Sequence, residues 1–235
     1  MRTSNHKIAC LLIISSVVIS GCATTKQHSS ISELQPTLSN LKIALMPVDV
    51  RLSILTAGGM HEPQAEWSQA AEKNIHAAIK KIEETRELEF VQYQRPDAAD
   101  KTASTLIELE RLHGAVGQAI LFNKYQVKLP TKKDVFDWTL GSTAIVMRDA
   151  TNADYALFIH LRDSYSSGGR IFMQFAAALL GVGIAGGQQI GFASLVDLRT
   201  GDVVWFNYLA SSAGDLRTYE KAKKTVDLLL KNLPT

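Results

Sequence analysis

The sequence predicts an α/β or α+β domain, with a mixed β-sheet of about five strands flanked by helices. Three observations support this fold class. Several segments repeat apolar residues at steps of three and four, which places those residues on one face of a helix. Between these segments lie short runs rich in β-branched and aromatic residues, which are typical of strands. The order is strand, helix, strand, helix, short helix, strand, insert, strand, strand and helix, so helices can pack on a mixed sheet.

The first half of the folded part supplies two strands and two long helices. Residues 41–48 (LKIALMPV) predict a buried strand, and residues 49–59 are expected to form a loop. Pro63 suits the first turn of a helix, whose apolar face comprises Trp67, Ala71, Ile75, Ala78 and Ile82. Residues 88–93 alternate like a strand. A second amphipathic helix follows, with apolar residues at Leu106, Leu109, Leu112, Val116 and Ile120.

The second half is expected to contain three strands and two helices. Residues 140–150 predict a short helix, and the alternation over residues 155–162 predicts a strand. Residues 189–198 and 203–210 are joined by a short glycine-containing segment, which predicts a β-hairpin. Steps of three and four over residues 219–233 predict a closing helix that stops before a proline.

An apolar insert separates the third and fourth predicted strands. Residues 171–185 (IFMQFAAALLGVGIA) are apolar apart from Gln174. A buried core helix is one interpretation. A second is that residues 168–189 contact a membrane or another subunit, through Ile171, Phe172, Phe175, Leu179 and Leu180. A complete membrane span is the third, but the length is marginal for one.

Residues 1–21 have the layout of a signal peptide. Arg2 and Lys7 precede a 12-residue apolar stretch, which is too short to span a bilayer. The segment ends in the residues Ile-Ser-Gly before Cys22, which resembles the lipobox of bacterial lipoproteins. This resemblance implies cleavage before Cys22 and a covalent lipid on its thiol. An ordinary secretory signal followed by a chance cysteine is the alternative.

The remaining features of the N-terminal region fit this interpretation. Cys10 would be lost with the signal peptide, so the mature chain would have no second thiol and no disulfide. By the same resemblance, Ala23 favours the outer membrane, with the protein facing the periplasm. Residues 22–40 are then a lipidated cysteine with a flexible tether, and residues 41–235 a single periplasmic domain.

Composition and charge exclude a nucleic-acid partner. The chain has 235 residues, with 25 basic and 23 acidic side chains. It has no polybasic stripe and no acidic tail, so electrostatics do not favour nucleic acid. Loss of the signal peptide removes Arg2 and Lys7 and brings the formal charge to zero. The basic character therefore belongs mostly to the signal.

The sequence shows no signature of catalysis, and we expect no catalytic residues, no metal site and no cofactor beyond the lipid. His61-Glu62 lacks the second histidine of a zinc-protease helix. Glu72 and His76 lie one turn apart, but two ligands do not make a site. His160 has Asp163 nearby and no nucleophile that we can name. A G-x-G-x-x-G spacing over residues 181–186 lies at the end of the apolar insert, outside the strand-to-helix context that a nucleotide requires.

Short motifs indicate a family. The residues ADY at 153–155 open a strand, and the later hairpin carries Asp197, Thr200, Gly201 and Trp205. This plan resembles periplasmic lipoproteins of the curli-secretion-channel and penicillin-binding-protein-activator type. The segments at residues 49–51, 56–59 and 166–170 are similar to an uncharacterised group of outer-membrane lipoproteins on the same plan.

The resemblance implies a non-enzymatic envelope protein that acts by binding. One type in this class assembles a ring-shaped export channel, with two membrane-inserted hairpins per subunit, and another docks on a cell-wall synthase. This chain offers a single apolar insert. We therefore expect an outer-membrane-anchored assembly, accessory or regulatory module whose partner is an envelope protein or a second copy. Alternatives are a subunit of an oligomeric secretion or transport complex that uses residues 168–189, and a periplasmic hydrolase.

Overall fold

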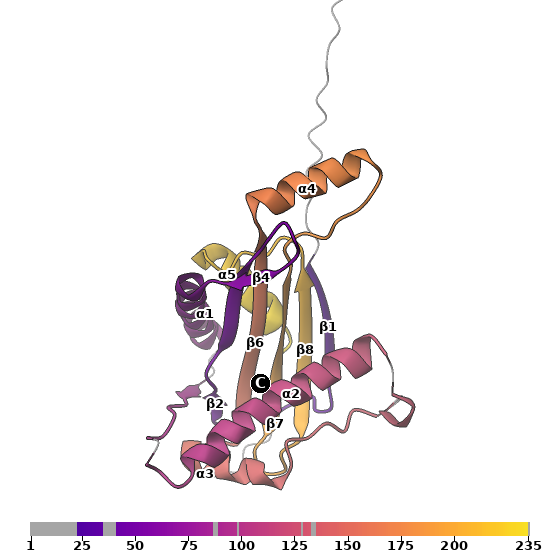
Figure 1. Ribbon diagram of the computed structural model, residues 1–235. Coiled ribbons are helices and arrows are strands. Elements are labelled where there is room, and N and C mark those ends of the chain that lie inside the picture. The colour runs from indigo at the N-terminus through magenta and orange to yellow at the C-terminus, as the bar shows by residue number, and fades with distance from the viewer. Residues whose placement is uncertain are drawn as a thin grey trace, which may run out of the picture.

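The computed structural model describes residues 23–34, 41–86, 89–97, 99–127, 129–132 and 135–234. Its centre is one mixed sheet with the strand order β1-β8-β7-β6-β2-β5, in which β3 also pairs with β6, and β4 with β3 (Figure 1). The strands are β1 (Ala23–Ser29), β2 (Ile43–Leu45), β3 (Asp49–Leu55), β4 (His61–Pro63), β5 (Phe90–Gln92), β6 (Tyr155–Ser166), β7 (Gln189–Asp197) and β8 (Val203–Ser211).

Helices cover both faces of this sheet, so the predicted fold class is confirmed, with more than five strands (Figure 1). The helices are α1 (Ala65–Arg86), α2 (Ala103–Tyr125), α3 (Ile145–Thr151), α4 (Gly168–Leu179) and α5 (Tyr219–Leu229), with short 3-10 turns at Pro130–Lys132 and Ser142–Ala144. The long helices and the hairpin lie where the apolar periods place them.

The alternation along β6 divides the core into two layers. Tyr155, Leu157 and Ile159 belong to the cluster that packs against α1 and α5. Ala156 and Phe158 belong to the cluster on the α2 and α3 side. This two-sided burial explains why β6 is apolar over most of its length, as expected of a central strand.

Two segments differ from the sequence prediction. Asp49–Leu55 was expected to be a loop, but it forms β3 and runs parallel to β6 from Asp49↔His160 to Leu55↔Ser166. Polar and apolar residues alternate in β3 because one face meets the core while the other is partly exposed. The irregular residues 46–48, which include Pro47, separate β2 from β3, although both strands follow the same edge of β6.

The flexible tether predicted for residues 22–40 is also wrong in its first part. Ala23–Ser29 form the edge strand β1, antiparallel to β8. An edge strand needs little apolar burial because its backbone pairs on one side only, so its polar side chains gave no strand signal. The signal peptide, Cys22 and residues 35–40 lie outside the described residues, so those predictions stay open.

Candidate functional site: an exposed apolar helix and the cleft beside it

Local hydrogen bonds define both ends of α4. At its start, the Ser167 hydroxyl accepts a hydrogen bond from the Arg170 backbone N–H at 3.1 Å, which caps the helix. At its end, Gly181 has a φ of +75°, and Val182 N–H donates to the Ala177 carbonyl at 2.9 Å. This glycine-based ending is a Schellman motif, so α4 is a short helix with a defined stop.

The apolar side chains of α4 face away from the protein. No residue of α4 is buried. Phe172 is 69% exposed, Phe175 66% and Leu180 82%, and Ile171 and Leu179 are exposed as well. All five predicted contact residues therefore lie on an open surface, and the interpretation as a buried core helix is wrong. Among the described residues no helix is both long and apolar enough to cross a membrane.

The other side of α4 is polar and is fastened to the protein. The Arg170 guanidinium donates to the Ala185 carbonyl at 2.8 and 3.1 Å and to the Ala57 carbonyl at 3.3 Å. One turn later, the Gln174 amide donates to the Ile184 carbonyl at 3.2 Å. These bonds hold α4 against its returning loop, with its apolar side outward.

The start of the described chain lies at the same end of the sheet as α4. Ala23 pairs with Ser211, and Ser211 pairs with Gln189, where β7 begins after the loop that follows α4. β6 ends at Ser166, immediately before α4. The residue next to Cys22 and the exposed apolar helix therefore share one end of the molecule (Figure 1).

A cleft of about 610 Å³ lies beside α4, between the β3–β4 hairpin and strands β6 and β7. Arg51, His61, Arg162 and Arg170 line it, together with the apolar residues Leu55, Pro63, Ala185 and Ile190. Sequence patterns alone did not single out this arginine cluster. The i, i+2 alternation of β3 and of β6 is the sequence signal for it. That signal indicates a cluster only when the strand register, which pairs Arg51 with Arg162, is known.

Asp49 connects this cleft to a second polar group. Its carboxylate lies 2.8 Å from Arg162 and 2.9 Å from His160. Partial burial opposes ionisation, but hydrogen bonds from His160 and Arg162 outweigh it and hold the pKa of Asp49 well below its usual range. Asp163, which is near His160 in the sequence, does not take part, because residues three apart in a strand point to opposite faces.

The second polar group is a buried contact between His113 and Ser194 on the α2 side of the sheet. His113 stacks on Phe158 at 3.8 Å between ring centroids, and its Nε2 lies 2.5 Å from the Ser194 hydroxyl. Burial lowers the pKa of His113 to about 3. Both side chains are at least 95% buried, so this pair packs in the core layer on the α2 side, where His113 also borders a second cavity of about 440 Å³.

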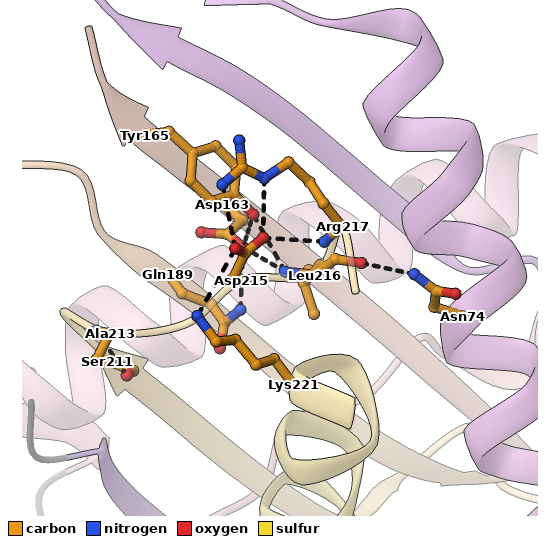
Figure 2. A network of polar contacts seen from close by, with 10 residues as sticks. All are labelled: Asn74, Asp163, Tyr165, Gln189, Ser211, Ala213, Asp215, Leu216, Arg217 and Lys221. Atoms are coloured by element: carbon orange, nitrogen blue, oxygen red, sulfur yellow. Dashed lines mark hydrogen bonds and ion pairs between the residues drawn. The ribbon is translucent and has the colours of Figure 1, made fainter. Parts of the chain in front are cut away.

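Asp163 instead organises the opposite face of the sheet (Figure 2). Its Oδ2 accepts hydrogen bonds from Tyr165 at 2.5 Å, Gln189 at 3.1 Å and the Leu216 backbone N–H at 3.0 Å. Burial raises the pKa of Asp163. The Arg217 guanidinium covers the Tyr165 ring at 3.9 Å. This network ties β6, β7 and the segment before α5 together directly beneath the α4 end.

The other histidines and acids singled out from the sequence do not converge. His61 lines the cleft, where its Nδ1 lies 3.0 Å from the Ser53 hydroxyl. Glu72 is exposed and His76 partly exposed on α1. Within the described ranges, no group of three or more histidine, cysteine, aspartate or glutamate residues could hold a metal ion. Gly181 and Gly186 lie in the loop after α4, not in a strand-to-helix turn.

Comparison with known proteins found a distant similarity to solved structures. No family model and no curated protein matches the chain. Two similar solved structures are PelC dodecamers from Paraburkholderia phytofirmans, both 13% identical to this chain and matching 90% of it. One covers 99% of the PelC chain with a TM-score of 0.39, and the other, a point variant, covers 98% with a TM-score of 0.40. The function proposed below rests on α4 and its surroundings.

Proposed function

We propose that this chain is a lipoprotein of the bacterial outer membrane that faces the periplasm and uses α4 to seat itself on the bilayer. It acts there without catalysis, as an assembly, accessory or regulatory binding module. The observation that carries the proposal is the exposed apolar face of α4 at the end of the sheet where Ala23 begins. Lipid on Cys22 and the side chains of α4 would then enter the same leaflet.

The size of α4 favours an interfacial position. A bilayer span requires roughly 20 residues, whereas α4 has 12. A helix that lies in the membrane plane buries its apolar face about 5–10 Å into the head-group boundary. Transfer of each large apolar side chain contributes about 1.5–3 kcal/mol, so Ile171, Phe172, Phe175 and Leu179 add substantially to an acyl anchor.

An acyl anchor and a helix have different roles in this arrangement. The lipid retains the protein at the membrane, while α4 decides which face of the domain meets it. Arg170 bonds α4 to the Ala57 carbonyl between β3 and β4, and Arg170 and Gln174 bond it to the loop that returns to β7, so its orientation is transmitted to the sheet. β6 spans 12 residues, or roughly 40 Å, which would place α3 deep in the periplasm, where a partner protein could bind.

The test replaces one aromatic residue of α4 with tryptophan. Full-length Phe175→Trp protein is reconstituted in vesicles whose acyl chains carry bromine, which quenches tryptophan only on contact. We expect stronger quenching than in wild-type protein, since residue 175 would lie among acyl chains. Phe122→Trp is the matched control, because Phe122 is also exposed, at 52%, but lies on α2.

The same experiment separates the alternatives. Equal quenching of the two variants would show that α4 does not enter the bilayer. If the fluorescence of the Phe175→Trp variant shifts to the blue without quenching, and the mass in mild detergent is a multiple of the monomer, α4 is a subunit contact instead. That outcome would contradict the proposed membrane contact and favour a subunit of an oligomeric secretion or transport complex.

A further inference from the structure

We propose that the cleft beside α4 binds the phosphate head group of an anionic glycerophospholipid. This inference deepens the proposed function, because the membrane on which α4 sits would supply the lipid. Arg170 lies on the polar side of α4 and also lines the cleft. A surface helix holds its polar side at head-group depth, so the cleft opens at the level where lipid phosphates lie.

The charges in the cleft are arranged for an anion. Arg51 and Arg162 are direct cross-strand neighbours, and like charges in that position destabilise a sheet unless something neutralises them. Asp49 neutralises one of them, at 2.8 Å from Arg162 but 3.6 Å from Arg51. Arg170 adds a third guanidinium. The lining therefore has more cationic than anionic charge.

The acid that also borders this cleft does not cancel the excess. Asp163 is 2% exposed, and its carboxylate is engaged by Tyr165, Gln189 and Leu216 on the opposite face of the sheet. The Arg51 side chain is 74% exposed, and its ion pair with Asp49 engages only Nε. Its two terminal nitrogens can thus form the paired hydrogen bonds that guanidinium makes with phosphate.

The apolar part of the lining distinguishes a lipid from a free anion. Ile190 of β7 pairs with Arg162 from the strand opposite β3, so one row on the same face of the sheet runs Arg51, Arg162, Ile190. Leu55, Pro63 and Ala185 extend this apolar wall. A phosphate at the arginines would place its glycerol esters and first methylene groups against these side chains, where their burial is favourable.

The test uses full-length protein in mild-detergent micelles that contain a phosphatidylglycerol with a photoreactive group next to its glycerol ester. Illumination followed by peptide mass spectrometry should place the lipid on segments that line the cleft. Arg51→Gln should reduce labelling about fivefold, the effect of losing one exposed ion pair of about 1 kcal/mol. Arg51→Lys keeps the charge but loses the paired guanidinium donors, so its labelling should be intermediate between that of wild-type protein and that of Arg51→Gln.

Arg111→Gln is the matched control, since Arg111 is an exposed arginine on α2 that does not line this cleft and borders instead the second cavity, whose lining also includes Arg51. It should leave labelling unchanged, and an equal loss would mean that only overall charge attracts the probe. Equal labelling by the phosphatidylcholine analogue would also overturn the proposal. If inorganic phosphate abolishes labelling, the cleft is a site for a free anion. Because micelles replace the bilayer here, labelling can succeed even if the Phe175→Trp variant shows no quenching in vesicles, so the two proposals fail separately.

Discussion

At the scale of single residues, Asp49 is the acid that orders the basic side chains next to the cleft. It holds Arg162 and His160 at hydrogen-bond distance and lies between the buried polar group and the cleft. The hydrogen bonds that lower the pKa of Asp49 also fix Arg162 in its place between Arg51 and Ile190. Asp49 therefore positions the cationic side of the cleft and would not itself contact a ligand phosphate.

The proposed lipid anchor is also a single-residue prediction. In bacteria supplied with an alkyne analogue of palmitate, the chain should be labelled, because the proposed lipid is attached to Cys22. Cys22→Ser should lose this label completely. Cys10→Ser should keep it, because Cys10 lies in the segment that would be removed. Label that depends on Cys10, or that survives Cys22→Ser, would exclude the lipoprotein assignment.

At the scale of elements, α4 is attached to the domain rather than part of its core. We expect that replacing residues 168–186 with a short Gly/Ser linker leaves the fold intact, since no residue of α4 is buried. Ser166 and Gly187 are already joined by a 3.0 Å hydrogen bond, so a short linker can close the gap.

The free energy of unfolding should change by less than about 1 kcal/mol, because loop length alone has a small effect. Urea unfolding followed by circular dichroism measures it. The matched control is Ile75→Ala in α1, where the side chain is fully buried, and there we expect a loss of about 2–5 kcal/mol. If the linker variant were as unstable as the Ile75→Ala variant, α4 would contribute to the stability of the domain as a core element does.

The elements that the sequence predicted well are those whose apolar side chains meet the core. The period of α1 at Ala71, Ile75, Ala78 and Ile82 matches its buried face, and the alternation of β6 matches its two layers. β1 gave no such signal, because an edge strand is stabilised by backbone pairing. The polar face of β3 gave none, because it is partly exposed and does not meet the core. For α4, apolar composition could not distinguish a core helix from an exposed one.

The site was harder to predict than the fold for the same reason. The five apolar contact residues are close together in sequence and were visible as a group. The arginine cluster of the cleft joins residues 51, 162 and 170, which are brought together only by the parallel register of β3 and β6 and by the return of α4. Single-sequence patterns do not contain that register.

At the scale of the whole molecule, the two ends of the sheet have different proposed tasks. The α4 end carries the apolar helix and the start of β1 (Figure 1). The cationic cleft lies beside α4 at the same end. The Asp163 network lies directly beneath it and fixes β6, β7 and the segment before α5 relative to one another (Figure 2). The α3 end would project into the periplasm and meet a partner.

The most direct test of the proposed contact between α4 and the bilayer is made in living cells. The photoreactive residue p-benzoylphenylalanine is placed at position 175 of the full chain, or at position 122 as a control, and cells are illuminated. The proposed function predicts a phospholipid adduct at position 175 and none at position 122. An adduct at position 175 that joins a second copy of the chain or another protein, with no lipid adduct, would contradict it.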